Sequence, residues 1–270
     1  MTNRTREGWH GWDEYAAFYD WENALTVGRR DVAFWRDLAT RLGGRALELG
    51  CGTGRVLLPV AKAGVPIVGI DRSTPMLRRA SERLRRLRTP VQASIVRGDI
   101  RDLPFGPRSP FDLVMAPYGI LQSLVRERDL QRTLDAVLRV LTPGGTFGID
   151  LVPDVPRWEE YQRRISLRGR IGPEGQPITL IESVRQDRAR RLTIFDQEFL
   201  HGRGARLQRH RFSLTFRTLS VRALRGRLER AGFVVDAVLG GYDGRPWDDR
   251  ADTWVVLASR PNRRLQGRLS

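Results

Sequence analysis

Three glycines and one carboxylate stand together in the stretch ALELGCGTGR, residues 46–55, and could build a ligand site. The glycines alternate with other residues directly after an apolar run, at Gly50, Gly52 and Gly54. Glu48 lies two positions before the first of them. Glycines let the chain turn sharply and let a ligand approach the backbone. A carboxylate beside them would repel a pyrophosphate and favour a cationic ligand.

Two cofactor classes use a glycine loop that follows a strand. The dinucleotide fingerprint has the spacing G-x-G-x-x-G, whereas the spacing here is G-x-G-x-G. Arg55 stands where the third dinucleotide glycine belongs. S-adenosylmethionine carries an ammonium and a sulfonium and no phosphate, so it suits Glu48 better. A dehydrogenase is the distant alternative.

Two further acids end the next predicted strands. Asp71 closes the strand predicted at 66–71, where it could accept hydrogen bonds from both ribose hydroxyls in either cofactor class. Asp99 closes the strand predicted at 93–99. An acid there can take an adenine amino group, with Ile100 donating its backbone N–H. The carboxyl ends of parallel strands meet at one edge of the sheet, which is where ligands of such folds bind.

The elements that must position these residues alternate between strands and helices up to about residue 152. Apolar runs predict strands at 45–50, 66–71, 93–99, 111–117 and 146–152. Helical spacing predicts helices at 56–64, 74–88 and 128–141, the last stopped by Pro143-Gly144-Gly145. This alternation predicts a parallel sheet with helices on both faces.

The pattern changes to a period of two between residues 154 and 217, which indicates antiparallel strands. The clearest such segments lie at 178–187, 191–200 and 205–218. A helix at 220–233 with Ser220 as its N-cap, and strands at 234–240 and 253–259, then close the α/β pattern. The expected parts are a helical cap segment at 1–43, a cofactor-binding core at 44–153 and 218–260, the insertion at 154–217 and a tail at 261–270.

In this order, the motifs resemble those of the class I S-adenosylmethionine-dependent methyltransferases. LELGCGTG resembles their first motif, VGIDRS the second, GDIRDLPF the third and FDLVMAPYGIL the fourth. The resemblance covers about residues 40–152 and 220–260. It implies an α/β, Rossmann-like, seven-stranded, mostly parallel sheet in the order 3-2-1-4-5-7-6 with its last strand antiparallel, plus the inserted antiparallel β subdomain. It also implies S-adenosylmethionine as cofactor and S-adenosylhomocysteine as product.

The same resemblance implies a set of cofactor-binding residues. They are Tyr19, Glu48, Gly50, Cys51, Gly52, Gly54, Arg55, Asp71, Arg72, Met76, Asp99, Ile100 and Ala116. Three of them have a simpler interpretation: Gly54 could serve only helix packing, Cys51 could be a small space-filler, and Met76 could be core.

Methyl transfer needs an acceptor held in line with the leaving sulfur. FYDWE resembles the stretch that precedes the core in many small-molecule methyltransferases, which places Tyr19 near the sulfonium, where an aromatic ring suits a cation. Helix packing is the alternative role for Tyr19, and Tyr15 lies one turn earlier on the same face. The chemistry needs no metal, and the three histidines show no metal-ligand spacing, so no metal site is expected.

Further catalytic candidates are Tyr118 and Gln122, after the fourth strand, and Arg217, which could clamp a substrate carboxylate or face solvent. The layout resembles glycine and sarcosine methyltransferases and amino-sugar dimethyltransferases. Some of the latter carry a catalytic histidine soon after the fourth strand, where this chain has Gln122 and Ser123. Tyr242 or Trp247 could reach the active site or could pack a turn.

The composition bounds the partners. The net charge of +16 allows a polyanion, but Lys62 is the only lysine among 47 basic residues. That bias is typical of a GC-rich genome, so a solvated surface is the simpler explanation. Cys51 is the single cysteine, which fits a reducing compartment. No secretory signal or membrane span is evident, so we expect a cytoplasmic bacterial protein.

The sequence thus predicts a methyltransferase acting on nitrogen or oxygen of a small molecule, with no membrane partner. Nucleic acid is the less favoured partner, and the inserted sheet could form a homodimer. Two alternatives stay open: an RNA methyltransferase that uses its arginine-rich surface, and a non-catalytic protein that only binds the cofactor.

Overall fold

A computed structural model describes residues 11–26, 30–106, 110–151, 159–248, 250–251 and 253–262. The described residues fall into two compact units. The insertion unit is drawn from Met1–Gly28, Gln122–Val125 and Asp154–Thr218. The core unit is drawn from Arg29–Leu121, Arg126–Pro153 and Leu219–Ser270.

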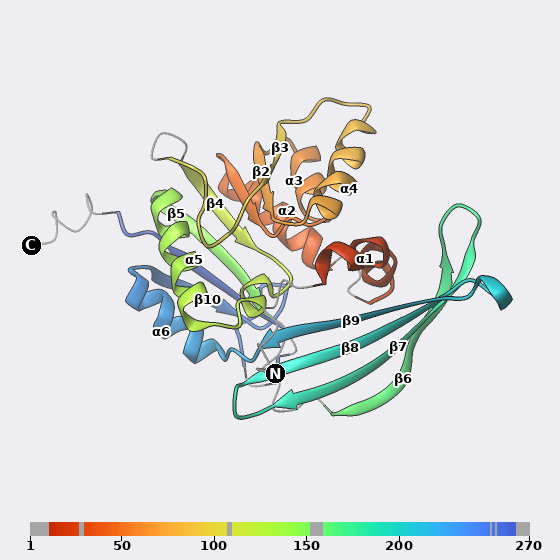
Figure 1. Cartoon of the computed structure of the whole chain (residues 1–270). Coiled ribbons are helices and arrows are strands. Elements are labelled where there is room, and N and C mark those ends of the chain that lie inside the picture. Colours follow the sequence, from red (N-terminus) through yellow and green to blue (C-terminus); the bar gives the residue numbers. More distant parts are fainter. Residues whose placement is uncertain are drawn as a thin grey trace, which may run out of the picture. The chain divides into compact units, whose positions relative to one another are not determined.

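The core unit contains a seven-stranded sheet in the order β3-β2-β1-β4-β5-β11-β10 (Figure 1). Its strands are β1 Ala46–Leu49, β2 Ile67–Asp71, β3 Ala93–Arg97, β4 Phe111–Ala116, β5 Leu141–Leu151, β10 Val234–Leu239 and β11 Trp254–Ser259. The last strand, β11, is antiparallel to both of its neighbours, and the pairings among the first five strands are parallel. The predicted order 3-2-1-4-5-7-6 is confirmed.

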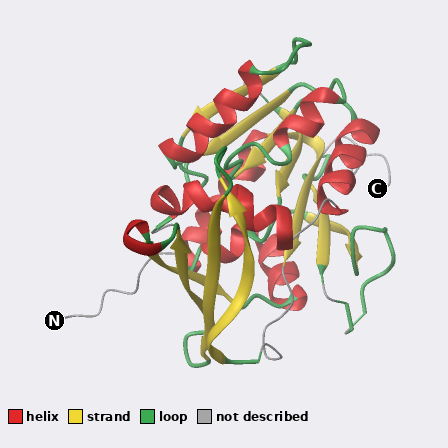
Figure 2. Ribbon diagram, turned by 90° about the vertical axis from the view of Figure 1, so that its right-hand side faces the viewer, coloured by secondary structure: helices red, strands yellow, loops and turns green. Residues whose placement is uncertain are grey.

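Helices cover both faces of this sheet, as Figures 1 and 2 show. They are α2 Arg30–Leu42, α3 Leu57–Lys62, α4 Thr74–Arg85, α5 Glu127–Val140 and α6 Val221–Ala231. The four residues of β1 are all buried, as expected for a parallel strand covered on both sides. Apolar strands and amphipathic helices in this order explain why the sequence pattern located the core elements.

Local capping signals set two helix starts and one helix end. The Ser73 hydroxyl accepts the Met76 N–H at 3.3 Å at the start of α4. Ser220 caps α6 in the same way by accepting the Ala223 N–H at 3.2 Å, as predicted. Gly232 ends α6 with a φ of 99°, a conformation that glycine adopts without strain.

Strand β5 differs from its prediction because it begins at Leu141, before the Pro143-Gly144-Gly145 segment. These residues end the helix as expected, yet they do not form a separate loop. Gly144 donates its N–H to the Arg260 carbonyl at 2.8 Å, and Arg260 donates its own to Gly145 at 3.0 Å. Pairing with the residue after β11 therefore carries the strand through the glycines.

The insertion unit contains a four-stranded antiparallel sheet in the order β6-β7-β8-β9 and one helix. Its elements are α1 Trp12–Thr26, β6 Tyr161–Ile171, β7 Gln176–Asp187, β8 Leu192–His201 and β9 Gln208–Arg217. Strand β6 has no counterpart among the three segments singled out from the sequence. It is an edge strand whose residues are mostly exposed, so it lacks the apolar alternation that marks a half-buried strand.

Aromatic side chains join α1 to the inserted sheet. Phe18 stacks on Phe199 with ring centroids 4.5 Å apart, and Phe199 meets Phe212 at 5.8 Å. Tyr15 contacts Phe212 edge-on at 5.5 Å. These rings form a small core of their own between the helix and strands β8 and β9.

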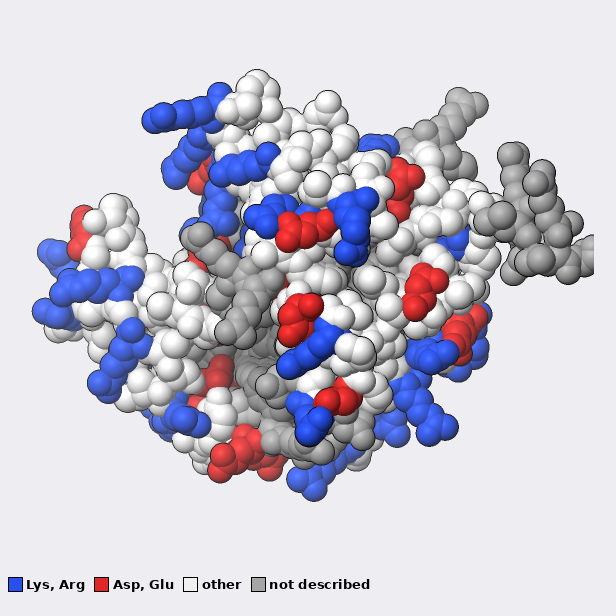
Figure 3. Space-filling model, turned by 180° about the vertical axis from the view of Figure 1, so that it is seen from behind, with Lys and Arg blue, Asp and Glu red and all other residues white. Residues whose placement is uncertain are grey.

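On the face shown in Figure 3, basic side chains lie at many places, with acidic side chains among them. Arg227 pairs with Glu127 at 2.6 Å, and Arg225 pairs with Glu229 at 2.8 Å. None of the described helices is long and apolar enough to cross a bilayer. The described residues also contain no cluster of three or more His, Cys, Asp or Glu side chains that could hold a metal ion.

Candidate functional site

The glycine loop after β1 combines two kinds of glycine. Gly50, Gly52 and Gly54 have φ values of 62°, 52° and 80°, where a side chain is strained. A Cβ on Gly54 would lie 2.3 Å from Leu58, and one on Gly50 would lie 2.6 Å from Ile120. A Cβ on Gly52 would meet nothing closer than a carbonyl oxygen at 3.9 Å. Gly50 and Gly54 thus serve close packing, whereas Gly52 faces open space.

Glu48 is 3% exposed on β1 directly before this loop. Its Oε2 atom is buried and has no hydrogen-bond partner among the described residues. Burial raises the pKa of Glu48 to about 8, although the charge of Arg55 opposes that rise. Burial disfavours the ionised form of this carboxylate, and a cation bound beside it would favour that form again.

Asp71 ties the loop after β1 to the start of α4. Its Oδ2 accepts the Gly52 N–H at 2.9 Å, and its Oδ1 accepts the Ser73 N–H at 2.8 Å. Asp71 therefore orders the glycine loop itself, a role that the sequence did not predict.

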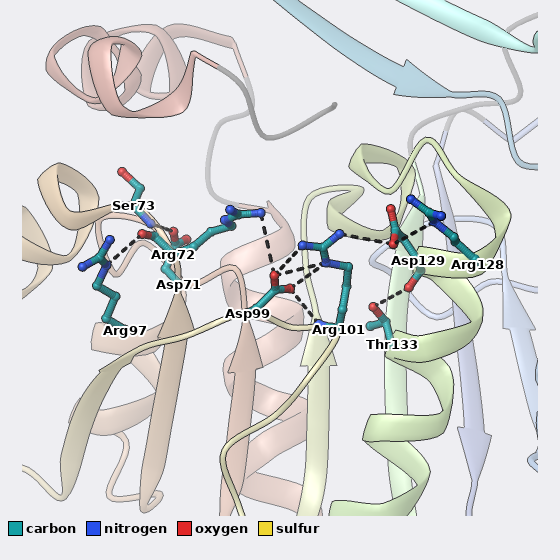
Figure 4. A network of polar contacts seen from close by, with 9 residues as sticks. All are labelled: Asp71, Arg72, Ser73, Arg97, Asp99, Arg101, Arg128, Asp129 and Thr133. Carbon is teal, nitrogen blue, oxygen red and sulfur yellow. Dashed lines mark hydrogen bonds and ion pairs between the residues drawn. The ribbon is translucent and has the colours of Figure 1, made fainter. Parts of the chain in front are cut away.

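Asp99 is held by an arginine that the sequence analysis missed (Figure 4). Arg101 donates to the two Asp99 oxygens at 2.9 and 2.6 Å, and its other side reaches Asp129 of α5 at 3.2 Å. Arg72 lies 3.8 Å from Asp99. Burial works to raise the pKa of Asp99, but the hydrogen bonds and charge of Arg101 outweigh it and hold that pKa below its ordinary value. The adenine acceptor proposed from the sequence is thus an ionised, oriented carboxylate.

Arg55 is matched with a buried acid from a distant helix. Its guanidinium makes contacts of 2.8 and 2.6 Å to Asp31 of α2, whose side chain is fully buried. It also lies 5.2 Å from the centre of the Tyr118 ring. Tyr118 has a φ of 59°, unusual for a non-glycine residue.

The loop after β4 is held by a buried aspartate on β5. Asp150 accepts the Gly119 N–H at 2.8 Å and the Tyr242 hydroxyl at 2.9 Å. Burial raises the pKa values of both Asp150 and Tyr242. Tyr242 therefore acts through Asp150 on the backbone beside Tyr118. Trp247, the other late candidate, meets Trp254 edge-on at 6.2 Å.

Several other predicted cofactor residues lie at the same edge of the sheet but are covered. Cys51 is 3% exposed, Met76 is 2% exposed and Ala116 is fully buried. The Cys51 Sγ atom lies 2.7 Å from where a Cβ on Gly69 would stand. Burial raises the pKa of its thiol, as expected of a space-filling cysteine rather than a nucleophile. Ile100 is half-buried after β3.

The remaining catalytic candidates belong to the insertion unit. Gln122 donates to the Arg217 carbonyl at 3.4 Å, and the Arg217 guanidinium reaches the Leu124 carbonyl at 3.4 Å. Tyr19 is half-buried on α1, with its ring 6.0 Å from that of Tyr15. The fold therefore brings Gln122 together with Arg217 and Tyr19 together with Tyr15.

Comparison with known proteins decides the family. A family model described as a methyltransferase domain matches residues 46–145. Demethylmenaquinone methyltransferase of Paenarthrobacter aurescens is 31% identical over 189 residues, which are 64% of this chain and 69% of that protein. The chain belongs to the class I S-adenosylmethionine-dependent methyltransferases.

Further relatives of this methyltransferase match more of its length. Cypemycin N-terminal methyltransferase of a Streptomyces species is 28% identical over 244 residues, 90% of this chain and 94% of that protein. The structure of CcbJ methyltransferase from Streptomyces caelestis has a TM-score of 0.72 at 22% identity, covering 87% of this chain and 89% of that one. Sugar N-methyltransferase KedS8 from a Streptoalloteichus species has a TM-score of 0.71 at 18% identity, covering 90% and 92%.

The methyltransferase uses S-adenosylmethionine, and the residues at the sheet edge fit that cofactor. The unmatched Oε2 atom of buried Glu48 suits its ammonium. The open space beside Gly52 allows close approach to the backbone. The ionised Asp99 suits a donor such as an amino group. Arg101 supports Asp99, Asp31 pairs with Arg55, and Asp150 holds the loop after β4; no local motif marks these three residues.

Proposed function

We propose that this methyltransferase methylates an amino nitrogen on a small molecule or a peptide terminus. The observation that carries the proposal is the similarity to cypemycin N-terminal methyltransferase across 90% of the chain. The match to demethylmenaquinone methyltransferase spans 64% of the chain. The solved structures of sugar N-methyltransferase KedS8 and of the glycopeptide N-methyltransferase MtfA share the fold over 90% and 85% of this chain. Their names agree with methylation at nitrogen.

The residues after β4 favour nitrogen over oxygen as the acceptor. S-adenosylmethionine supplies an activated methyl group on a sulfonium. A neutral amine can attack that carbon with its own lone pair, whereas a hydroxyl usually needs a general base beside it. Gln122 is fully buried and Ser123 is 6% exposed in this segment, and neither side chain titrates near neutral pH. Their chemistry suits an acceptor whose nitrogen is the free amine at the moment of attack.

In this proposal, the residues of the chain bind the cofactor and orient it. Glu48 would hold the amino acid ammonium of the cofactor, Asp71 the ribose hydroxyls and Asp99 the adenine amino group. Asp150 fixes the backbone of the loop after β4. Positioning of this kind supplies most of the rate enhancement that such a displacement needs.

We further propose a cytoplasmic protein whose acceptor is not a nucleic acid. Acidic side chains lie among the basic ones on the face in Figure 3, which disfavours a continuous phosphate-binding surface. A homodimer through the inserted sheet stays a prediction, and sedimentation of the purified chain tests it.

A partition experiment tests the proposed function. The protein is incubated with methyl-labelled S-adenosylmethionine and separate pools of amino sugars, short peptides, hydroxylated small molecules and RNA. We expect label in an amine-containing pool, on a nitrogen that acetylation beforehand protects. Label confined to hydroxylated molecules or to RNA would overturn the proposal.

A further inference from the structure

Two carboxylates of the insertion unit share one amide group. Glu22 on α1 and Glu182 on β7 each accept a hydrogen bond of 3.0 Å from the Nε2 atom of Gln197 on β8. The Tyr15 hydroxyl donates to Glu22, and the Tyr161 hydroxyl donates to Glu182. Both carboxylates are half-buried. They therefore lie side by side with only neutral groups bonded to them.

This pair lacks the counter-ion that the buried acids Asp31, Asp129 and Glu198 have. Among the residues that the structure describes, no basic side chain forms an ion pair with Glu22 or Glu182. By contrast, buried Glu198 on the neighbouring strand pairs with Arg163 at 3.0 Å and with Arg211 at 3.1 Å. Burial, and then the charge of Glu182, raises the pKa of Glu22.

An unsatisfied acceptor lies between the two acids. Gln197 is 5% exposed, and its Oε1 atom has no hydrogen-bond partner in the described part of the chain. Its Nε2 atom bridges both carboxylates, so Oε1 of the same amide lies beside them. A water molecule could satisfy this oxygen but would leave the charge unmatched. A protonated amine would satisfy both, because it carries three donors and a positive charge.

Aromatic rings flank the acids on the same face of α1. Trp12, Tyr15 and Tyr19 form an edge-on group with centroids 5.4, 6.0 and 6.1 Å apart. Trp12 and Tyr19 are half-buried. Ring faces attract cations, so the half-buried rings of Trp12 and Tyr19 suit a cationic group near Glu22.

We propose that Glu22, Glu182 and Gln197 form a binding site for the protonated amino group of the acceptor. The inference rests on the proposed function and names the substrate class of that function as a cationic amine. On binding, the ammonium would donate one hydrogen bond to each carboxylate and one to the Gln197 oxygen. It would pass one proton to a carboxylate before its nitrogen, then neutral, attacked the methyl group. A neutral alcohol of the same shape could not match the two charges.

Binding of a matched pair of probes to the full chain, without cofactor, tests the site. Cyclohexylamine is cationic at neutral pH, and cyclohexanol has similar size without the charge. Ligand-observed NMR reports binding, and so does the intrinsic fluorescence of the seven tryptophans, two of which, Trp12 and Trp21, lie on α1. We expect the amine to bind at least about 10-fold more tightly than the alcohol, since one charged hydrogen bond contributes about that much. Equal binding of the two probes would overturn the site.

Variants assign the binding to these residues. Glu182→Gln should weaken amine binding about 10-fold, and Glu182→Asp should retain part of it. Glu174→Gln, in an exposed turn of the same sheet, should change nothing. Glu22→Gln is a second variant should Glu182→Gln fail to fold, which circular dichroism shows. Unchanged amine binding in both folded glutamine variants would refute the assignment.

The two proposals can fail separately. Methylation of amines by a protein that does not prefer cyclohexylamine would remove this site and leave the proposed function. Amine binding that depends on Glu182, in a protein that transfers label only to hydroxyl groups, would keep the site and refute the proposed acceptor.

Discussion

The two units of this methyltransferase treat their buried acids differently. In the core unit, Asp31 is ion-paired with Arg55 at 2.6 Å, and Asp99 and Asp129 share Arg101. In the insertion unit, Glu22 and Glu182 share only the amide of Gln197. The charge of an ion-paired acid is already neutralised within the protein, so such an acid stabilises the fold. The charge of an acid without a counter-ion is not neutralised, so a cationic ligand can pair with it.

Within the described core unit, Glu48 and Asp150 are both buried without an ion pair. Asp150 is held by the Gly119 N–H and the Tyr242 hydroxyl, so Glu48 is the informative case. It is buried, and its Oε2 atom lacks a hydrogen-bond partner in the described residues. It also lies where the ammonium of S-adenosylmethionine is expected. At Glu22 and Glu182, which are half-buried, the atom without a hydrogen-bond partner among the described residues is instead the Oε1 of Gln197 between them. Single substitutions can therefore test whether acids with and without a counter-ion differ in their effects on ligand affinity and stability.

The largest effect is expected at the glycine that faces open space. Gly52→Val should abolish cofactor binding, by at least about 1000-fold, because its side chain would fill that space. Calorimetry with S-adenosylhomocysteine measures the loss. Gly64→Val is the matched control, since Gly64 also has a positive φ, 88°, with nothing within 4 Å. Both variants should lose about 1–2 kcal/mol of stability from backbone strain. Tight binding by Gly52→Val would contradict the cofactor site.

Glu48→Gln should weaken cofactor affinity by about 100-fold, the upper range for a hydrogen bond to a charged group. The parent should bind more tightly as pH rises toward about 8, the pKa of Glu48, because binding needs the ionised form. The variant should lose this pH dependence. Glu229→Gln on exposed α6 is the control. Identical pH profiles for parent and Glu48→Gln would remove Glu48 from the site.

The same pKa predicts how the cofactor-free protein responds to pH. The folded state raises the Glu48 pKa from 4.5 to about 8, so the folded chain holds this proton more tightly than the unfolded chain does. Its stabilising contribution is complete below pH 4.5 and is lost as pH rises through about 8. Above that pH, Glu48→Gln should therefore melt at a higher temperature than the parent.

Arg101→Met should weaken cofactor affinity by about 10-fold, because Asp99 loses the bidentate contact that orients it. The cofactor affinity of Arg101→Lys should lie between those of the parent and of Arg101→Met, since an ammonium cannot make the bidentate contact of the planar guanidinium. The preference for S-adenosylhomocysteine over its inosine analogue should also shrink, which a purely structural role would not cause. Arg97→Met, at an exposed position, is the control. An unchanged preference would limit Arg101 to a structural role.

Tyr242→Phe should reduce the free energy of unfolding by about 1–2 kcal/mol, because it leaves a buried Asp150 oxygen with only a weak contact. That contact is Trp35 at 3.4 Å. Urea unfolding measures the loss, and cofactor affinity should change little. A variant as stable as the parent would mean that the Tyr242 hydroxyl does not support Asp150.

The smallest changes in stability are expected when one ion-paired acid of the core unit and one acid without an ion pair in the insertion unit are neutralised in turn, and the two changes should have opposite signs. Asp129→Asn should destabilise the core unit by about 1 kcal/mol, because Arg101 loses a charged partner. Glu22→Gln should instead raise the melting temperature slightly at alkaline pH, since the raised pKa of Glu22 means that its ionisation costs stability. Thermal melts between pH 6 and 9 measure both. Destabilisation by Glu22→Gln would indicate that this acid is compensated after all.

The sequence predicted the core elements because their signals are local. Apolar strands such as 66–71, the glycines at 50–54 and the cap at Ser220 each depend on neighbouring residues alone. The edge strand β6 was missed because mostly exposed residues leave no such alternation. Strand β5 began earlier than predicted because Arg260, from the far end of the chain, pairs with its glycines.

The sequence by itself determined the order of strands and helices in the α/β core, the glycine loop and the acids at the ends of the parallel strands. Tertiary structure decided which acids are compensated. Arg101 reaches Asp129 from another element, and Asp31 on α2 meets Arg55. Glu22 and Glu182 lie 160 positions apart in sequence and meet on one amide. Periodicity follows from a residue's neighbours in the chain, whereas the pairing of a charge depends on folding in space.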